Sequence, residues 1–384
     1  MGPVKRIWRE WKELRAFKRI PRAQRQIVVY SEGGGYLTFL EPIIHALWAE
    51  HGQPVLYVTS SPDDPYLSAP PAGVTAFQIG TGTVRTAFFS MLDVDVLAMT
   101  MPDLETFHIK RSLNGVHYAY IQHSIVSTHM VYREAAFDNF DTVFCAGPHH
   151  IAEIRKREAL RDLPPKHLVK AGYCRLDSIM HAVEEADAAT VSKNTVLVAP
   201  SWGPDGLIEK HGPEVVETLL DAGLNVILRP HPRTMAFHGD LVRGIGARFE
   251  GSERFRLDTD PNAVTSLLSA QVMISDWSGA ALEFGFGLLR PVLFVDVPRK
   301  INNPAYGDLG IDPLEVSVRD RLGTVLPVTQ LQDIGNKVRK LMGAADTWHH
   351  DLQTARQELV YNAGKSGSAG AQALMEILHK RRPR

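Results

Sequence analysis

The sequence predicts an α/β protein made of two doubly wound, Rossmann-like domains, with a basic helix at the N-terminus. Three observations lead to this prediction. Short β-branched runs alternate with helical patterns in two series, which is typical of parallel sheets with helical crossovers. A polar, Ala/Glu-rich stretch at residues 178–194 separates the two series. The length of 384 residues also exceeds what one ordinary core accommodates.

The first series begins after residue 25, and a Ser-Glu-Gly-Gly-Gly turn joins its first strand to its first helix. The strands expected in this half are 27–30, 55–59, 74–79, 94–99, 118–121 and 142–145, with helices at 37–50 and 151–160. The second series is expected to supply strands 195–199, 225–228, 271–274 and 292–295, with helices near 213–222 and from Gly279. Residues 331–380 have a helical pattern and end in a basic tail. The expected domains are therefore 26–178 and 190–350, flanked by a helix in 1–25 and a helical tail at 351–384.

Composition narrows the classes of protein. Hydrophobic residues make up 44% and charged residues 22%, as in soluble globular proteins, and the net charge of -1 does not favour a nucleic-acid partner. Two cysteines are too few for a disulfide framework, and no Cys/His spacing indicates zinc. No apolar run of about 18 residues is present, and the first 25 residues lack the apolar core of a secretory signal. We expect a cytoplasmic location.

The N-terminal segment differs from the rest of the chain in charge. Residues 1–25 contain nine Lys/Arg and two Glu, a net charge of +7, which leaves -8 for the remainder. Helical spacing places Val4, Ile7, Trp8, Trp11 and Leu14 on one face. Such a helix suits an anionic membrane surface, although packing of the two Trp on the protein body is the alternative. The residues expected to contact the membrane are Lys5, Trp8, Arg9, Trp11 and Lys12.

Three loops that follow expected strands of the second half carry unusual polar groups. Ligands of open α/β sheets bind at the carboxyl ends of strands, so these loops are candidates for a nucleotide-diphosphate donor. The first loop contains Ser201 and Trp202, a hydroxyl and an indole between glycines and prolines. Side chains of these kinds at the end of a strand can line a nucleotide pocket. An ordinary turn is the alternative.

The second loop contains Arg229, His231 and Arg233. Prolines on both sides of His231 restrict the backbone and stiffen the presentation of the imidazole. Guanidinium groups pair with phosphate oxygens, and an imidazolium can donate to a leaving oxygen. We therefore expect these residues to bind a diphosphate, with a solvated structural loop as the alternative.

The third loop lies between a strand and an apolar helix. Small residues at the helix start leave backbone N–H groups open to an anion, which the helix dipole also favours. A serine there can bond a phosphate or simply cap the helix, and a glutamate one turn later can accept from a ribose or acceptor hydroxyl. The residues expected to bind the donor are Ser275, Asp276, Ser278, Gly279 and Glu283.

In the first half, Gly33, Gly34 and Gly35 open a helix without the spacing of a dinucleotide or P-loop motif. We expect their backbone to approach a bound acceptor. His123 follows the strand at 118–121, and an imidazole there can take a proton from an attacking hydroxyl. His129 lies nearby as a competitor and is expected to contact the acceptor.

From about residue 122 to residue 313 the chain resembles the CDP-glycerol glycerophosphotransferases, enzymes of teichoic-acid and capsular polymers. The resemblance rests on the order and spacing of several motifs. These are Gln122-His-Ser, Phe137-Asp-Asn-Phe-Asp141, Gly172-Tyr-Cys-Arg-Leu-Asp177, residues 196–202, Arg229-Pro-His-Pro232, Ile274-Ser-Asp-Trp-Ser278, Pro291-Val-Leu-Phe294 and Tyr306-Gly-Asp308. The chain departs from the family pattern at Ser124, Cys174 and Gly279.

This resemblance implies a GT-B fold with the donor in the cleft between the domains, and peripheral attachment at the cytoplasmic face of the cell membrane. It implies a CDP-alcohol donor such as CDP-glycerol, and a lipid or lipid-linked glycan acceptor. His123 would act as the base, while His231 and the serine loop would hold the diphosphate. An acceptor oxygen would attack the phosphorus that bears the alcohol, and CMP would leave. We expect no obligatory cofactor and no metal.

Two other readings remain open. The same fold binds UDP-sugars, so a glycosyltransferase or UDP-sugar epimerase is one alternative, and the nucleotide released separates it from the first reading. A catalytically inactive, membrane-associated scaffold is the second alternative.

Overall fold

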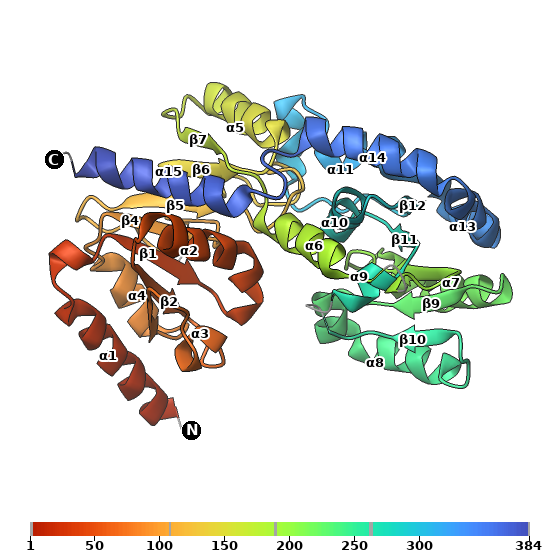
Figure 1. The fold of residues 1–384 in the computed structure, drawn as a ribbon, viewed down its shortest axis with the longest axis horizontal. Coiled ribbons are helices and arrows are strands. Elements are labelled where there is room, and N and C mark those ends of the chain that lie inside the picture. The colour runs from red at the N-terminus through yellow and green to blue at the C-terminus, as the bar shows by residue number, and fades with distance from the viewer. Residues whose placement is uncertain (1–2, 107–108, 188–189, 261–263, 383–384) are drawn as a thin grey trace. The chain divides into compact units, whose positions relative to one another are not determined.

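A computed structural model describes residues 3–106, 109–187, 190–260 and 264–382. The chain forms two compact units (Figure 1). Unit 1 comprises Met1–Ser124, Tyr132–Asp177 and Val360–Arg384, and unit 2 comprises Ile125–Val131 and Ser178–Leu359. Each unit contains a parallel β-sheet, so the prediction of two doubly wound domains is confirmed.

The sheet of unit 1 has the strand order β3-β2-β1-β4-β5-β6-β7, and all neighbouring strands are parallel. The order runs outward from β1 in one direction and from β4 in the other, which places a switch point between these two strands. The strands are β1 (Ile27–Ser31), β2 (Val55–Thr59), β3 (Val74–Gln78), β4 (Val96–Met99), β5 (His117–Ile121), β6 (Thr142–Cys145) and β7 (His167–Lys170).

Helices cover both faces of this sheet (Figure 1). The C-terminal helix α15 packs against α2, and Leu374 and Ile377 share one core with Leu40 and Leu47. The helices of unit 1 are α1 (Pro3–Arg19), η1 (Arg22–Gln24), η2 (Gly34–Tyr36), α2 (Leu37–His51), α3 (Pro65–Ser68), α4 (Thr83–Ser90), α5 (Pro148–Arg161) and α15 (Ser366–Arg381). Helix α6 (Cys174–Glu185) begins in unit 1 and continues into the part of the chain that belongs to unit 2.

The sheet of unit 2 has the order β10-β9-β8-β11-β12-β13, again with parallel neighbours. Its switch point lies between β8 and β11, so the loops after these strands start at the same edge of the sheet. The strands are β8 (Thr195–Val198), β9 (Asn225–Leu228), β10 (Phe255–Leu257), β11 (Val272–Ser275), β12 (Val292–Asp296) and β13 (Gly323–Pro327).

Helices of unit 2 bury apolar residues against this sheet. Val215, Val242, Ile334 and Val338 lie in one core with residues of β8, β9, β11 and β12. The helices are α7 (Leu207–Asp221), α8 (Pro232–Phe249), α9 (Thr265–Ser269), α10 (Gly279–Leu288), η4 (Pro304–Leu309), α11 (Leu314–Ser317), α12 (Arg319–Leu322), η5 (Val328–Asp333), α13 (Ile334–Gly343) and α14 (Ala345–Leu359).

The structure differs from the sequence-based expectation at both ends of the second domain. Residues 351–384 do not form a separate tail, because α14 belongs to unit 2 whereas α15 completes the core of unit 1. Residues 125–131 belong to unit 2 although they lie within the expected first domain. Both differences arise from contacts between residues far apart in the chain, which local patterns do not report.

Candidate functional site

Three loops of unit 2 converge on the indole of Trp202. This residue follows β8, and the guanidinium carbon of Arg233, after β9, lies 4.6 Å from the centroid of its ring. The ammonium nitrogen of Lys300, after β12, lies 4.2 Å from the same ring. The centroid of the His231 imidazole is 6.3 Å away. An aromatic face attracts cations through its quadrupole, so the indole holds two positive charges at the carboxyl edge of the sheet.

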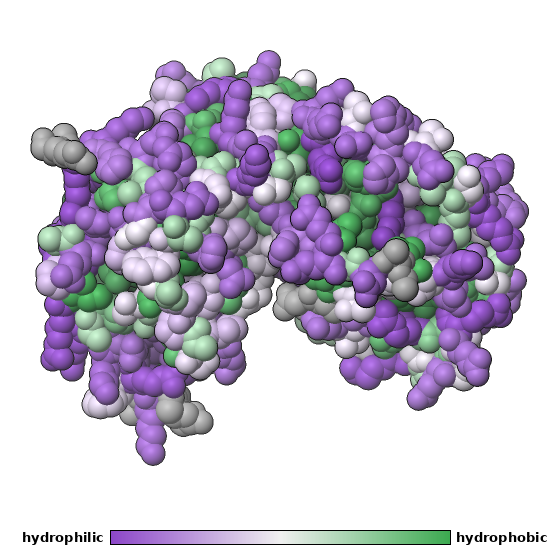
Figure 2. Space-filling model, viewed as in Figure 1, coloured by the Kyte–Doolittle hydropathy of each residue, from purple (hydrophilic) through white to green (hydrophobic). Residues whose placement is uncertain are grey.

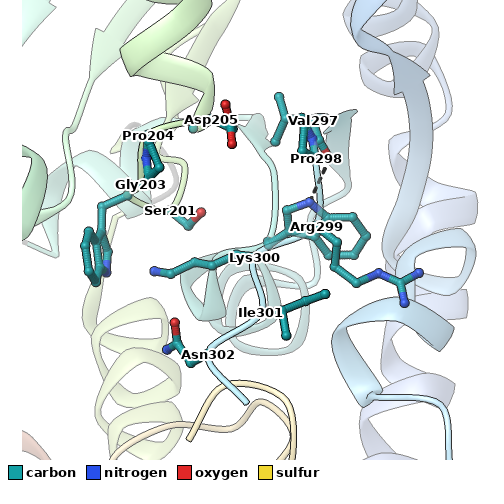
Figure 3. Close-up of a pocket in the computed structure, with 13 residues that line it drawn as sticks. Ser201, Gly203, Pro204, Asp205, Val297, Pro298, Arg299, Lys300, Ile301 and Asn302 are labelled. Carbon is teal, nitrogen blue, oxygen red and sulfur yellow. Dashed lines mark hydrogen bonds between the residues drawn. The ribbon is translucent and has the colours of Figure 1, made fainter. Parts of the chain in front are cut away.

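A pocket with a volume of about 250 Å³ adjoins this cluster. Residues 201–206 form one wall, and Trp277 with residues 297–302 forms the other (Figure 3). Lys300 extends toward the side of the pocket where Ser201 and Asn302 lie, whereas Arg299 points the other way. The volume is slightly below the roughly 300–1,000 Å³ of small-molecule sites, so the pocket has room for part of a small-molecule ligand.

Burial weakens the charges at this site. It lowers the pKa of Lys300 from 10.5 to about 8, an effect that Asp276 and Glu209 oppose and Arg233 reinforces. Burial, followed by the positive charges of Lys300 and Arg233, lowers the pKa of His231 to about 4. The imidazole is therefore neutral at physiological pH and lies beside two cations. An anion bound here would relieve the repulsion between these groups.

The backbone determines which nitrogen of His231 carries the proton. His231 is the N-cap of α8, and its Nδ1 accepts a hydrogen bond of 3.1 Å from the backbone N–H of Arg233. A neutral imidazole with Nδ1 as acceptor carries its hydrogen on Nε2. That N–H is a donor suited to a phosphate oxygen.

In unit 1, His123 lies at the carboxyl end of β5 with a partly exposed edge. The rings of Tyr36, Phe39, Tyr120 and Tyr132 lie around it, with centroids 5.5 to 6.1 Å from its own. This aromatic surrounding excludes water and lowers the pKa of His123 to about 4, although a hydrogen bond to the carbonyl of residue 100 partly offsets the effect.

The same hydrogen bond sets the tautomer of His123. Nδ1 lies 2.9 Å from the carbonyl oxygen of Thr100 and 2.8 Å from the hydroxyl of Tyr120. A carbonyl only accepts, so Nδ1 carries the hydrogen, and the lone pair is on Nε2. The Tyr132 hydroxyl is 3.5 Å from Nε2. This arrangement allows Nε2 to accept a proton.

Searches with known structures find proteins of the same architecture. The wall teichoic acid polymerase TagF matches with a TM-score of 0.62 and 13% identity over 99% of this chain and 97% of that chain. A TagF variant soaked with CDPG matches with the same TM-score and coverage at 14% identity. A putative UDP-N-acetylglucosamine 2-epimerase from Listeria monocytogenes matches with a TM-score of 0.61 and 11% identity, over 94% and 97% of the two chains.

The chain has a GT-B fold. No protein-family model matches the sequence, and a sequence search of curated proteins also finds no match. At identities below 15% the structural likeness concerns the fold. The fold prediction is therefore confirmed.

Within this GT-B fold, Arg229 has a different environment from the one expected. Its guanidinium forms an ion pair of 2.7 Å with Asp258, and both side chains are almost buried. Asp258 also accepts a hydrogen bond from Ser266. The carboxylate of Asp258 therefore neutralises the arginine within the protein. Arg229 therefore connects β9 with the chain beyond β10.

Ser275 and Asp276 position the loop that carries Trp202. The hydroxyl of Ser275 donates to the carbonyl of Ala199 at 2.9 Å. A carboxylate oxygen of Asp276 accepts from the backbone N–H groups of Ser201 and Trp277, both at 2.6 Å. Burial raises the pKa of Asp276, and these hydrogen bonds oppose that effect. Both residues act on the pocket through the loop.

At the start of α10, Ser278 caps the helix, which is the alternative to phosphate binding that the sequence left open. The hydroxyl of Ser278 accepts from the backbone N–H of Ala280 at 3.3 Å, and Gly279 is the first residue of the helix. Glu283 is buried on the same helix. Trp277, just before this turn, lines the pocket, so the loop contributes to the site through its indole.

Lys300, Asn302 and Glu209 were not predicted as site residues from the sequence. Lys300 and Asn302 lie in the loop after β12, which ends at the same edge of the sheet as the three loops that were selected. The rule that ligands bind after strands would have included this loop. Glu209 accepts from the hydroxyl of Thr234 at 2.8 Å, a tertiary contact without a local signal.

The residues predicted to contact the acceptor separate into two groups. His129 belongs to unit 2, is buried, and its Nε2 donates to the carbonyl of Ile311 at 3.0 Å, whereas His123 belongs to unit 1. The turn at Gly33, Gly34 and Gly35 leads through η2 into α2, and Tyr36 of η2 and Phe39 of α2 lie beside the ring of His123. A side chain at Gly34 would come within 2.9 Å of Pro65, whereas Gly35 has open space.

Helix α1 packs on unit 1 with a face that includes Leu14 of the predicted apolar face but not Trp8. Leu14 and Phe17 are buried, and Phe17 contacts the rings of Phe77 and Phe88. Arg9 donates to Gln78 at 2.9 Å and so belongs to the packed side. Among the residues predicted to contact a membrane, Lys5, Trp8 and Lys12 are exposed, and Trp11 is partly buried. The side chain of Val4 lies outside the described residues.

On the face shown in Figure 2, hydrophilic residues predominate along the edge formed by α1. The side chain of Trp8 is nevertheless 67% exposed, and Ile7 beside it is exposed as well. Within the described part of the chain, no helix is long and apolar enough to cross a membrane. In the same ranges, no group of three or more His, Cys, Asp or Glu is arranged to hold a metal ion.

Proposed function

We propose that this chain is a transferase that takes an alcohol phosphate, such as glycerophosphate, from a CDP-alcohol and releases CMP. The acceptor is a hydroxyl or phosphate of a lipid or a lipid-linked glycan. The observation that carries the proposal is the cluster of Arg233, Lys300 and the His231 Nε2–H around Trp202, beside the pocket at the strand ends. Two cations and a neutral donor match the charge of a diphosphate.

The reaction follows from the roles of these groups. An acceptor oxygen forms a bond to the phosphorus that bears the alcohol, while the bond from that phosphorus to the bridging oxygen breaks, and this oxygen leaves on CMP. Lys300 and Arg233 neutralise the charge on the leaving phosphate, and His231 donates a hydrogen bond to it. If the acceptor is a hydroxyl, its proton goes to Nε2 of His123. Positioning and charge stabilisation supply most of the catalysis.

The choice between a CDP-alcohol and a UDP-sugar donor depends on the sequence motifs. The fold likeness to TagF and to the epimerase is nearly equal, with TM-scores of 0.62 and 0.61, so it does not discriminate between a CDP-alcohol and a UDP-sugar. The order of the motifs from Gln122 to Asp308 resembles that of the CDP-glycerol glycerophosphotransferases and favours the CDP-alcohol.

We place the enzyme at the cytoplasmic face of the cell membrane as a peripheral protein. Helix α1 supports this part of the proposal because Trp8 is exposed between Lys5 and Lys12, which are also exposed. An indole beside ammonium groups suits the headgroup layer of an anionic bilayer.

A panel of donors tests the activity. Purified protein is incubated with membrane extract and with CDP-glycerol, CDP-ribitol, UDP-glucose or UDP-N-acetylglucosamine, and the released nucleotide is measured. We expect CMP from a CDP-alcohol. Release of UDP, or interconversion of UDP-sugars, would replace the proposal with the glycosyltransferase or epimerase alternative. Turnover that Lys300→Ala leaves unchanged would show that the activity does not use this site, and inactivity with every donor would favour the scaffold.

A further inference from the structure

The residues that directly follow the His123 loop belong to the other unit. We call Ile125–Val131 the strap, since it belongs to unit 2 while the chain on both sides of it belongs to unit 1. His123 lies two residues before the strap, and Tyr132 lies directly after it. Their rings are 5.5 Å apart, and the Tyr132 hydroxyl is 3.5 Å from Nε2 of His123. The two ends of the strap thus meet at the candidate base.

A buried carboxylate anchors the centre of the strap. The backbone N–H of Ser127 donates to one oxygen of Glu315 at 2.8 Å, and the hydroxyl of Ser127 donates to the other at 2.7 Å. Ser127 is fully buried, and Glu315 is only 2% exposed. Paired hydrogen bonds to a carboxylate away from water are strong and directional. They hold the strap in one register against unit 2.

The loop that carries Lys300 holds the other half of the strap. The backbone N–H of Asn302 donates to the carbonyl of Met130 at 3.1 Å, and its side chain donates to the carbonyl of Val131 at 2.6 Å. The side chain of Asn303 donates to the carbonyl of His129 at 2.9 Å. Asn302 also lines the pocket, where Figure 3 shows it on the side toward which Lys300 extends.

We propose that Ser127 and Glu315 are positioning residues for His123, acting through the strap. Asn302 and Asn303, which follow Lys300 in the pocket loop, hold three further carbonyl groups of the same strap through their hydrogen bonds. The proposal deepens the proposed function, on which its kinetic consequence rests. Ser127 and Glu315 bond to each other and act on the reaction only through the position of His123.

The first test measures His123 itself and requires no activity. The imidazole is titrated by NMR in the full chain and in Ser127→Ala. Loss of the anchor releases Tyr132 from the ring and admits water, so the pKa of His123 should rise from about 4 toward the ordinary value of 6.5. An unchanged titration curve in a folded Ser127→Ala protein would overturn the proposal.

Ser266→Ala is the matched control. Ser266 is also fully buried, belongs to unit 2, and donates to a buried carboxylate, that of Asp258, but it does not contact the strap. Both variants should lose stability through the lost hydrogen bond, and only Ser127→Ala should move the His123 titration. Equal shifts in the two variants would show a general loosening and would contradict a specific anchor.

The second test separates kcat from KM. Ser127→Ala should lower kcat by about tenfold or more, the scale of a misplaced catalytic group, with the KM for the donor within about twofold. Glu315→Ala should have the same effect, and the double variant should be no worse than either single variant. If the losses of kcat in the two single variants added up in the double variant, Ser127 and Glu315 would act independently. That result would contradict the proposal. If the unaltered protein turns over no donor, the proposed function fails, and the His123 titration still decides the role of the strap.

Discussion

At the scale of single residues, the site around Trp202 is defined by positive charge held close together. Arg233 and Lys300 lie on one indole, and the lowered pKa of Lys300 reflects both its burial and the neighbouring guanidinium. Asp276 and Glu209 only partly compensate this charge. Two positive charges held this close repel each other, and a bound anion would offset that repulsion. The arrangement therefore favours binding of an anion.

Lys300 should make donor binding depend on pH. The ammonium is protonated below about pH 8 and loses its charge as the pH rises through that value. We therefore expect kcat/KM for the donor to fall above about pH 8, because kcat/KM reports ionisations of the free enzyme. The measurement is a pH–rate profile under conditions of limiting donor. A profile that is flat from pH 7 to 10 would remove Lys300 from the binding site.

Substitution of Lys300 should distinguish charge from shape. Lys300→Ala should raise the KM for the donor by about 10- to 100-fold, the scale of a lost hydrogen bond to a charged group. Lys300→Arg keeps its charge above pH 8 and should abolish the decline in kcat/KM there, even if its affinity is lower. If Lys300→Arg retained the decline, another group would be responsible for it.

The two histidines should each matter for turnover. His123→Ala and His231→Ala should lower kcat on the order of 100-fold or more, the scale of a positioned acid or base. Because His231 also caps α8, His231→Asn serves as the control: asparagine is a good N-cap but lacks the Nε2–H in that position. Thermal stability close to that of the unaltered protein, together with low activity of His231→Asn, would assign the loss to the reaction. Activity within a few-fold of the unaltered protein would exclude the histidine concerned.

At the scale of elements, α1 uses two faces. Leu14 and Phe17 pack on unit 1, while Trp8, Lys5 and Lys12 remain exposed. Deletion of the helix would therefore remove core residues as well as the proposed membrane contact. The buried face explains why this helix is part of the folded unit, and the exposed face is available to a partner.

Surface substitutions test the membrane contact without disturbing the core. A Trp8→Ala variant that also carries Lys5→Glu and Lys12→Glu should bind anionic vesicles more weakly, since each basic residue near such a surface contributes about 1 kcal/mol. Sedimentation with vesicles of anionic and of neutral lipids measures the effect. Leu14→Ala is the stability control and should cost about 2–5 kcal/mol of unfolding free energy. Unchanged binding of the triple variant would discard the membrane contact.

Central strands were predicted well, whereas three of the four edge strands were missed; the edge strand β3, expected at 74–79, is the exception. The boundaries of β2, β6 and β9 agree with the predicted ranges, because these strands are buried on both faces and consist of continuous apolar runs. Strands β7, β10 and β13 were missed, and all three lie at an edge of a sheet, where the residues are partly exposed and their pattern is weak.

At the scale of the whole molecule, the C-terminus completes the fold of the N-terminal unit. Leu374 and Ile377 of α15 lie in the core beside Leu40 and Leu47 of α2. Asp177 joins this contact by accepting from the backbone N–H of Ser366 at 2.5 Å and from its hydroxyl at 2.9 Å. The Gly-Tyr-Cys-Arg-Leu-Asp motif therefore has a structural role at its last residue.

Removal of α15 should unfold unit 1 selectively. In a chain that ends after Leu359, α2 and β1 should lose protection against amide hydrogen exchange, because a buried face of α2 becomes exposed to water. In the full chain, Leu374→Ala should cost about 2–5 kcal/mol of unfolding free energy. Normal protection of β1 in the shortened chain would show that α15 is dispensable.

Candidate site residues were predictable where they follow a strand. Trp202, His231 and Arg233 were found in this way, because loops after parallel strands meet at one edge of the sheet. The protein partners of Arg229 and His129 were not predictable: Asp258 pairs with the first, and the carbonyl of Ile311 accepts from the second, and neither partner is signalled by the local sequence.

The sequence by itself determined the two series of strands and helices, and hence the fold class, since hydrophobic periodicity is a local property of the chain. Tertiary structure alone decided which polar groups are neutralised by protein partners and which ones gather at Trp202. It also assigned α15 to unit 1 and residues 125–131 to unit 2. Ion pairs, caps and buried hydrogen bonds join residues distant in the chain, so their partners emerge only when the chain is folded.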